Sequence, residues 1–141
     1  MPLTDDDAIR DILGLQSIAV VGCSTTPGTA AHEIPAYLQR HGYEIHPVNP
    51  YAETVLGRPA VDSLGDVDAA VDVVNVFRPS EEVAGIVDDA LARYETRGDI
   101  EAIWLQLGIT DDDAMSEAEA AGLQTVQDRC LKIEHSRLLG E

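Results

Sequence analysis

Residues 22–28 (GCSTTPG) form a run of small and polar residues between an apolar stretch and a segment with helical periodicity. Such a loop can bind a phosphate group, because its backbone N–H groups and the first turn of the following helix attract an anion. A dinucleotide-binding fingerprint would place glycines where this loop has Gly22, Ser24 and Pro27. The spacing argues against NAD but still predicts a phosphate-binding turn that uses Gly22, Ser24, Thr25 and Thr26. The alternative is that these residues only close a tight turn.

The end of the second predicted strand, Val48-Asn49-Pro50, narrows the kind of nucleotide further. In NAD-binding units an acidic residue near this position hydrogen-bonds to the adenosine ribose. A neutral Asn49 does not repel a phosphate on that ribose. The sequence therefore favours NADP, or a 3′-phosphorylated nucleotide such as coenzyme A (CoA), over NAD.

Apolar, β-branched runs alternate with helical patterns along the chain. Strands are predicted at residues 17–22, 43–48, 70–77, 101–108 and 123–128. Helices are predicted at residues 30–41, within 78–98 with Ser80 as the cap, at 110–122 and at 130–139. Residues 49–67 form a turn-rich connection with room for one short strand. These β-α-β units predict one Rossmann-like α/β domain over residues 1–141, a doubly wound, mainly parallel sheet of about five strands with helices on both faces.

Within this domain, residues 1–16 are expected to be an acidic helical segment and residues 17–138 the core. Ligands of such sheets bind outside the carboxyl ends of the strands, at the point where the strand order reverses. The predicted loops at those ends carry Gly22-Cys23-Ser24, Asn49-Pro50, Phe77-Arg78, Gln106-Leu107-Gly108 and Asp128-Arg129-Cys130.

Several motifs in a fixed order resemble the small, single-domain CoA-binding proteins, whose fold is that of the CoA-binding domain in the α subunit of succinyl-CoA synthetase. The resemblance covers about residues 17–138 and is carried by VVGCS, PVNP, VNVFRP, WLQLG and DRCLKIEHSRL. It implies that CoA or an acyl-CoA is the ligand. It further implies that the pyrophosphate is held by Gly22, Cys23, Ser24 and the following loop, and that the adenosine is lined by Val48, Asn49 and Pro50. Phe77 and Arg78 would contact the nucleotide or its phosphates. The pantetheine path would run along Gln106, Leu107, Gly108, Arg129 and Cys130.

One segment departs from the family pattern. Where the family often has a basic residue followed by Pro-Ser, this chain has Thr29, Ala30 and Ala31. The loss of a cation and a hydroxyl should weaken phosphate binding, since a charge-assisted hydrogen bond contributes about 1.5–3 kcal/mol. Two alternatives to CoA binding therefore stay open: an NADP- or other nucleotide-dependent enzyme, and a regulatory module with a degenerate pocket and a protein partner.

No catalytic residue is predicted. The ligase relatives need a second domain with a phosphorylated histidine and a partner subunit, so the chain is expected to bind CoA without catalysis of its own. Four histidines lack metal-ligand spacing, and no metal is expected. Asp128, Glu134 and His135 are expected to cap and pair the last helix, and Trp104 to lie in the core with its N–H bonded locally.

Cys23 and Cys130 lack disulfide or metal spacing, which indicates a reducing compartment. Cys130, beside an arginine, could form a mixed disulfide with the CoA thiol, or simply pack at a strand–helix junction. For Cys23 packing is favoured over a pKa lowered by the nearby helix.

The net charge of −17, from 26 acidic and nine basic residues with Lys132 the only lysine, is unusual. It predicts a halophile with high internal salt, because self-repulsion of this size needs screening. It also argues against nucleic acid and anionic membranes as partners, since no basic cluster is present.

The acidic N-terminus and the lack of a long apolar run predict a cytoplasmic protein. A homodimer or an unknown protein partner stays possible.

Overall fold

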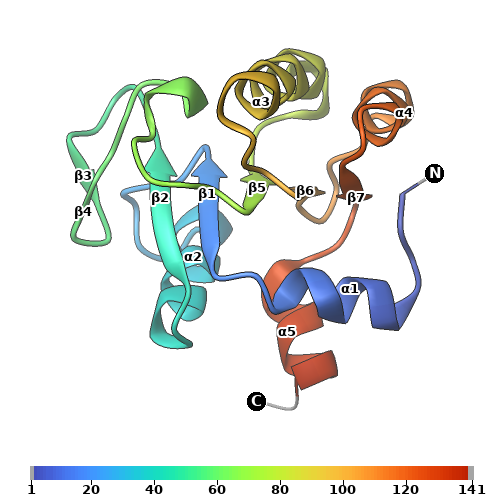
Figure 1. The fold of residues 1–141 in the computed structure, drawn as a ribbon. Coiled ribbons are helices and arrows are strands. Elements are labelled where there is room, and N and C mark those ends of the chain that lie inside the picture. Colours follow the sequence, from blue (N-terminus) through green and yellow to red (C-terminus); the bar gives the residue numbers. More distant parts are fainter. Residues whose placement is uncertain (1, 140–141) are drawn as a thin grey trace.

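Five strands form one parallel sheet in the computed structural model, which describes residues 2–139 (Figure 1). Their order across the sheet is β2-β1-β5-β6-β7. The bounds are β1 (Ser17–Val21), β2 (Glu44–Val48), β5 (Val73–Val76), β6 (Ala102–Leu105) and β7 (Gln124–Val126). Each lies within a predicted strand, and the order is that of a doubly wound sheet, with the chain moving outward to β2 and then crossing back to β5.

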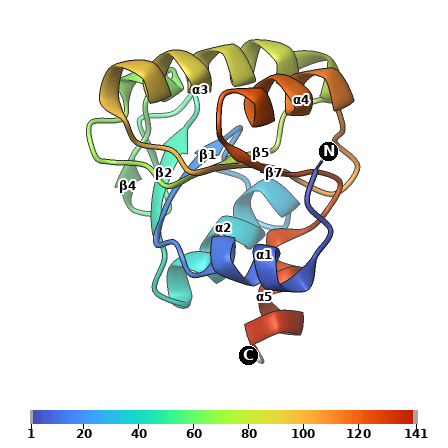
Figure 2. The same ribbon diagram turned by 45° about the vertical axis from the view of Figure 1, so that its right-hand side comes forward.

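Helices cover both faces of the sheet, as predicted (Figure 2). One face carries α1 (Asp6–Leu13), α2 (Ala30–Arg40) and α5 (Leu131–Leu139), and the other carries α3 (Val83–Arg97) and α4 (Asp112–Ala120). The pleat of each strand supplies both layers: on β1, Ile18 and Val20 face α1 and α2, whereas Ala19 faces the α3 side. A strand buried on both faces is therefore apolar without interruption.

The acidic N-terminal segment is helical and also contributes to the core. Asp5 caps α1 by accepting a hydrogen bond from the Ala8 N–H at 3.1 Å. On the opposite side of this helix, Ile9, Ile12 and Leu13 are almost completely buried against the sheet. The acidic face is solvated and the apolar face holds the helix in place.

Residues 49–67 contain two short strands rather than one. β3 (Thr54–Val55) and β4 (Arg58–Pro59) pair antiparallel. Leu56 and Gly57 form the turn between them with φ values of 55° and 75°. Positive φ at both central residues is the geometry of a type I′ hairpin. The prediction missed it because leucine is an unusual residue at the first of these positions.

Ser80 does not cap α3, contrary to the prediction. It begins a 3₁₀ turn, η2 (Ser80–Glu82), and α3 starts only at Val83 without a side-chain cap. The Ser80 hydroxyl instead accepts a hydrogen bond from the Thr110 N–H at 3.0 Å. It therefore ties the start of α3 to the loop that precedes α4.

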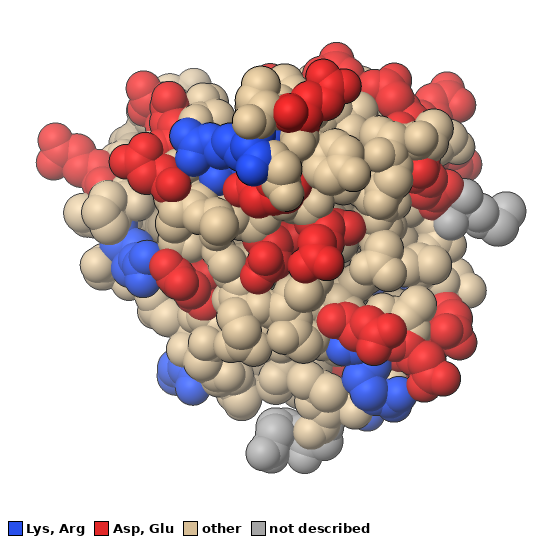
Figure 3. All heavy atoms as spheres, in the orientation of Figure 1, with Lys and Arg blue, Asp and Glu red and all other residues tan. Residues whose placement is uncertain are grey.

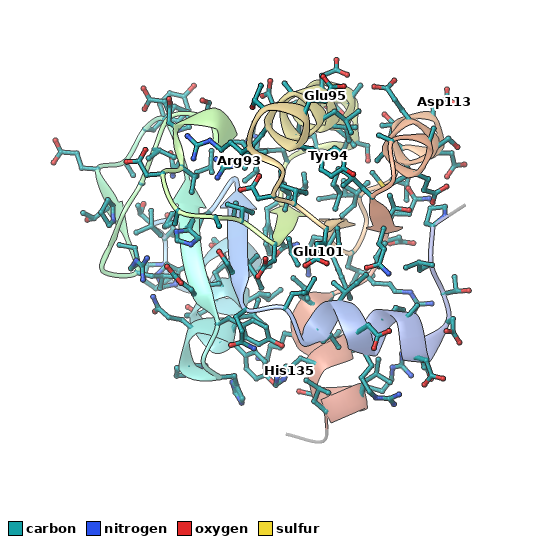
Figure 4. The ribbon with its side chains drawn as sticks, in the orientation of Figure 1. Arg93, Tyr94, Glu95, Glu101, Asp113 and His135 are labelled. Atoms are coloured by element: carbon teal, nitrogen blue, oxygen red, sulfur yellow. The ribbon has the colours of Figure 1, made fainter. Side chains whose placement is uncertain are left out.

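A buried arginine that the sequence did not single out fixes the other end of α3. Arg93 is 3% exposed and reaches from α3 toward the 3₁₀ turn η1 (Leu64–Asp66) (Figure 4). Its guanidinium donates to the Leu64, Val67 and Ala69 carbonyls at 2.7–3.0 Å and to both oxygens of Asp99. A buried charge needs this degree of hydrogen bonding to offset its lost hydration.

The surface reflects the charge of the sequence. Figure 3 shows acidic side chains spread across one face, with the cations in small groups beside them. Within residues 2–139 no helix is both long and apolar enough to cross a membrane.

Candidate functional site

A cleft of about 390 Å³ opens at the carboxyl ends of β1, β2 and β5. This is where the strand order reverses, which is the usual ligand position in such sheets. Seven of the residues singled out from the sequence line it: Gly22, Cys23, Ser24, Val48, Asn49, Pro50 and Arg78. The cleft therefore unites the predicted pyrophosphate and adenosine segments with Arg78.

A glycine is needed at position 22 because the side chain of Arg78 passes close to the backbone there. Gly22 has a φ of 90°, which favours glycine. A Cβ atom at this position would lie 2.9 Å from Arg78 Cδ and 3.3 Å from its Cγ. The absence of a side chain at Gly22 thus lets the stem of Arg78 lie directly over the end of β1.

The β1–α2 loop is anchored to its helix through a carbonyl that a proline leaves unpaired. Pro35 lies inside α2 and has no N–H to donate to the Ala31 carbonyl four residues earlier. The Ser24 N–H donates to this Ala31 oxygen at 3.0 Å. Pro35 therefore indirectly fixes the position of Ser24 at the cleft.

Several N–H groups of the loop are already engaged within the protein. The Thr26 N–H donates to the Ser24 hydroxyl at 3.0 Å, and the Gly28 N–H donates to the Glu33 carboxylate at 3.1 Å. The Gly28 N–H, followed by His32, lowers the pKa of Glu33. The Glu33 carboxylate therefore already occupies the Gly28 N–H, one of the N–H groups near the start of α2 that were predicted to bind a phosphate.

Asn49 links the ends of β1 and β2. Its side-chain nitrogen donates to the Cys23 carbonyl at 2.9 Å, and its side-chain oxygen accepts from the Tyr51 N–H at 2.8 Å. The amide thus serves both a donor and an acceptor, which a carboxylate could not do. This adds a structural reason for asparagine to the electrostatic one derived from the sequence.

Arg78 makes a two-pronged ion pair inside the cleft. Its Nε and Nη2 atoms donate to the two Glu82 oxygens at 3.1 and 2.8 Å. These hydrogen bonds to the Glu82 carboxylate raise the pKa of Arg78, and the same bonds lower the pKa of Glu82. The i,i+4 spacing of the two residues is a signal that could have revealed the pair.

Five further residues line the cleft that sequence reasoning did not select: Val21, Tyr51, Asp62, Glu82 and Ile86. Tyr51 is 95% exposed, so its ring stands free at the rim. Asp62 follows the β3–β4 hairpin, and it lies at the cleft because Val61 pairs with Val48 at the end of β2. Among the described residues that line the cleft, one cation faces two carboxylates, Asp62 and Glu82.

The remaining predicted residues lie elsewhere among those described. Phe77 packs against the α1–α2–α5 core. The Gly108 N–H donates to Asp128 at 2.7 Å, and Arg129 donates to Glu134 at 2.9 Å. Outside the lining of this cleft are Thr25, Thr26, Phe77, Gln106, Leu107, Gly108, Arg129 and Cys130.

The two cysteines are buried. Burial raises the pKa of the Cys23 thiol to about 12, which favours packing over a reactive thiolate. Cys130 is 8% exposed and belongs to the same core cluster. Its burial favours the packing interpretation over a mixed disulfide with a ligand.

Trp104, Glu134 and His135 have the structural roles expected of them around α5. The Trp104 N–H donates to the Arg129 carbonyl at 2.8 Å within the core. Glu134 accepts from Arg129 and Arg137, and Arg137 followed by Arg129 keeps the pKa of Glu134 low despite burial. His135, labelled in Figure 4, bonds to the Tyr37 hydroxyl at 2.8 Å. Asp128 bonds to the Gly108 N–H rather than to the helix.

A metal centre is not assembled by the described part of the chain. Within residues 2–139 no three His, Cys, Asp or Glu side chains gather closely enough to hold an ion.

The fold and the cleft define a Rossmann-like domain with a cleft at the switch point of the sheet. A family model for the CoA binding domain matches residues 16–136, and the chain belongs to this family. It is 39% identical over 129 residues to the uncharacterized protein YneT of Bacillus subtilis (strain 168), covering 91% of this chain and 92% of YneT.

Two further proteins are similar to the chain. A hypothetical protein from Pyrococcus horikoshii OT3 has a structure with a TM-score of 0.90 and 34% identity, covering 99% of this chain and 97% of that one. The acetate–CoA ligase [ADP-forming] II of Archaeoglobus fulgidus is 28% identical over 106 residues, which is 74% of this chain but 15% of the ligase. The match thus corresponds to a small part of that enzyme.

Proposed function

We propose that the protein binds CoA or an acyl-CoA in the cleft at the ends of β1, β2 and β5, and that it performs no catalysis of its own. The observation that carries the proposal is the convergence of Gly22, Asn49 and Arg78 on one cleft at the switch point, in a chain of the CoA binding domain family. The cleft volume of about 390 Å³ falls in the range of roughly 300–1,000 Å³ typical of ligand sites.

The residues present fit the nucleotide part of CoA. Because Gly22 has no side chain, the stem of Arg78 lies close to the backbone at the end of β1. Arg78 offers a planar, permanently charged donor to a phosphate, and Tyr51 offers an exposed ring on which adenine can stack. The pantetheine path along Gln106, Gly108, Arg129 and Cys130 stays a prediction from the family resemblance.

The absence of catalysis is proposed because the described residues that line the cleft include no hydrogen-bonded nucleophile–base pair. Its thiol, Cys23, is kept protonated by burial. Its polar groups Asn49 and Arg78 are used for hydrogen bonding and ion pairing. Formation of an acyl-CoA from ATP, CoA and a carboxylic acid by the purified chain would contradict this part of the proposal.

A regulatory role with a protein partner is the second candidate. It is favoured by the internal pairing of groups that a phosphate would otherwise use, namely the Gly28 N–H with Glu33 and Arg78 with Glu82. If this alternative holds, CoA does not bind, and a partner is sought by affinity capture at high salt.

Calorimetric titration tests the proposal. CoA, dephospho-CoA, NAD and NADP are compared in about 2 M KCl, where charges are screened within about 3 Å. We expect CoA to bind most tightly. Arg78→Ala should weaken CoA binding by tenfold or more, the loss expected for a charge-assisted hydrogen bond. Arg40→Ala, which removes an exposed arginine at the end of α2, should leave it unchanged. Tightest binding of NADP would favour the enzymatic alternative.

A further inference from the structure

The ion pair between Arg78 and Glu82 places a carboxylate where an anionic ligand would be bound. Arg78 uses Nε and Nη2 for two parallel hydrogen bonds to the Glu82 oxygens. This fork is the arrangement by which arginine also binds two oxygens of a phosphate. Both residues line the cleft, and the stem of Arg78 passes over Gly22, where a Cβ atom would lie 2.9 Å from its Cδ.

The ion pair between Arg78 and Glu82 is exposed enough for a ligand to replace Glu82. The side chains of Arg78 and Glu82 are 48% and 46% exposed. Ion pairs at this exposure are held weakly, because water competes for both partners. A buried pair such as Arg93–Asp99, at 2% and 13% exposure, has no comparable freedom to open.

The charge of the cleft opposes an anion while Glu82 stays in place. Asp62 and Glu82 together outweigh the single positive charge of Arg78 among the described lining residues. A ligand phosphate that approached Arg78 beside Glu82 would meet a like charge at close range. Replacement of the Glu82 carboxylate by the phosphate keeps Arg78 paired and removes this repulsion.

We propose that Glu82 is an internal competitor for the ligand, and that a phosphate monoester displaces it from Arg78 on binding. This inference rests on the proposed CoA-binding function and deepens it by naming the group that Arg78 receives. A phosphate monoester carries a charge of about −1.5 to −2 at pH 7, whereas the Glu82 carboxylate carries a single charge. The monoester therefore outcompetes Glu82, and a ligand without one does not. In CoA the group of this class is the 3′-phosphate.

The test compares Glu82→Gln with Glu81→Gln, which makes the same charge change at the exposed neighbouring residue outside the cleft. Each protein is titrated calorimetrically with CoA and with dephospho-CoA, at about 0.15 M and about 2 M KCl. We expect Glu82→Gln to bind CoA about two- to fivefold more tightly than the wild type at the lower salt, the range for loss of an exposed competing ion pair. The gain should shrink at the higher salt, because screening weakens the original pair.

Dephospho-CoA, which keeps the charged pyrophosphate but lacks the monoester, should gain less than CoA from Glu82→Gln. Glu81→Gln should behave as wild type with both ligands. CoA binding that is unchanged or weaker in Glu82→Gln would overturn the inference while leaving the proposed function intact. An equal gain with dephospho-CoA would overturn the assignment of the monoester to Arg78. No CoA binding by the wild type or by Glu82→Gln would refute the proposed function, and the inference with it.

Discussion

The N–H of Ser24 and the carbonyl of Ala31 are hydrogen-bonded at 3.0 Å, which connects the loop at the cleft to the first turn of α2. The bond exists because Pro35, four residues after Ala31, cannot donate to this carbonyl. Pro35, although proline is unfavourable inside a helix, thus leaves the Ala31 carbonyl available as an acceptor for the loop. The position of Ser24 depends on a proline that lies outside the cleft lining.

Pro35→Ala is expected to loosen this loop. The new N–H at position 35 competes for the Ala31 oxygen, so the Ser24 amide should exchange its hydrogen about two- to tenfold faster, the range for a net hydrogen bond of about 0.5–1.5 kcal/mol. Hydrogen exchange followed by NMR measures the rate. Pro59→Ala, in the β3–β4 hairpin, should leave Ser24 exchange unchanged. An unchanged Ser24 rate in Pro35→Ala would show that the loop is held in another way.

Gly22→Ala is expected to destabilise the fold more than Gly28→Ala. Both glycines have positive φ, 90° and 93°, so an alanine at either position costs about 1–2 kcal/mol of backbone strain. Only at Gly22 does the added Cβ also meet Arg78, at 2.9 Å, whereas nothing lies within 4 Å at Gly28. Denaturant unfolding measures the difference. If Arg78→Ala in the Gly22→Ala background restores no stability, the clash with Arg78 is not the cause.

Arg93→Ala is expected to lower the free energy of unfolding by about 3–5 kcal/mol, because it leaves Asp99 and three carbonyls without their buried donor. Arg97→Ala, one turn later on α3, removes an exposed arginine that donates to the Asp68 carbonyl at 3.2 Å, and should change it by about 1 kcal/mol or less. Urea unfolding of the three proteins makes the comparison. Equal losses in both variants would indicate a general effect of charge rather than the buried pair.

Acid should weaken the ion pair between Arg93 and Asp99. Burial alone would raise the pKa of Asp99, but hydrogen bonds from Arg93 and from the Val71 N–H outweigh it and hold the pKa below its ordinary value of 3.8. Because the pKa is lower in the folded state, the stabilisation is present above the unfolded pKa and is lost as the pH falls through the folded one. The stability difference between wild type and Asp99→Asn should therefore be constant above about pH 5 and shrink progressively below it. A difference that stays constant down to about pH 2 would contradict this assignment.

Much of the fold could be predicted, because its signals are local. Apolar runs such as residues 17–21 are β-branched and bounded by turns, and Gly42 and Gly98 mark the ends of α2 and α3. Seven cleft residues could be predicted as well, since parallel strands bring their carboxyl ends to one edge whatever the lengths of the connections. These predictions required no knowledge of side-chain contacts.

The missed features depend on contacts between distant segments. Asp62 reaches the cleft because the neighbouring Val61 pairs with Val48 at the end of β2, a contact between segments that no local sequence signal predicts. Gln106 also follows a strand, yet it is 5% exposed, because the start of α5 packs over it. Position at a strand end is readable from sequence, whereas exposure to a cleft depends on which element covers that end.

The most direct test of the account is the NMR mapping of CoA on the ¹⁵N-labelled protein in about 2 M KCl, where surface charge is screened. The account predicts saturable chemical-shift changes that centre on the amides of residues 22–24, 48–51 and 78–82, which surround the cleft at the ends of β1, β2 and β5. An absence of saturable changes, or changes centred on a surface away from these three segments, would contradict it.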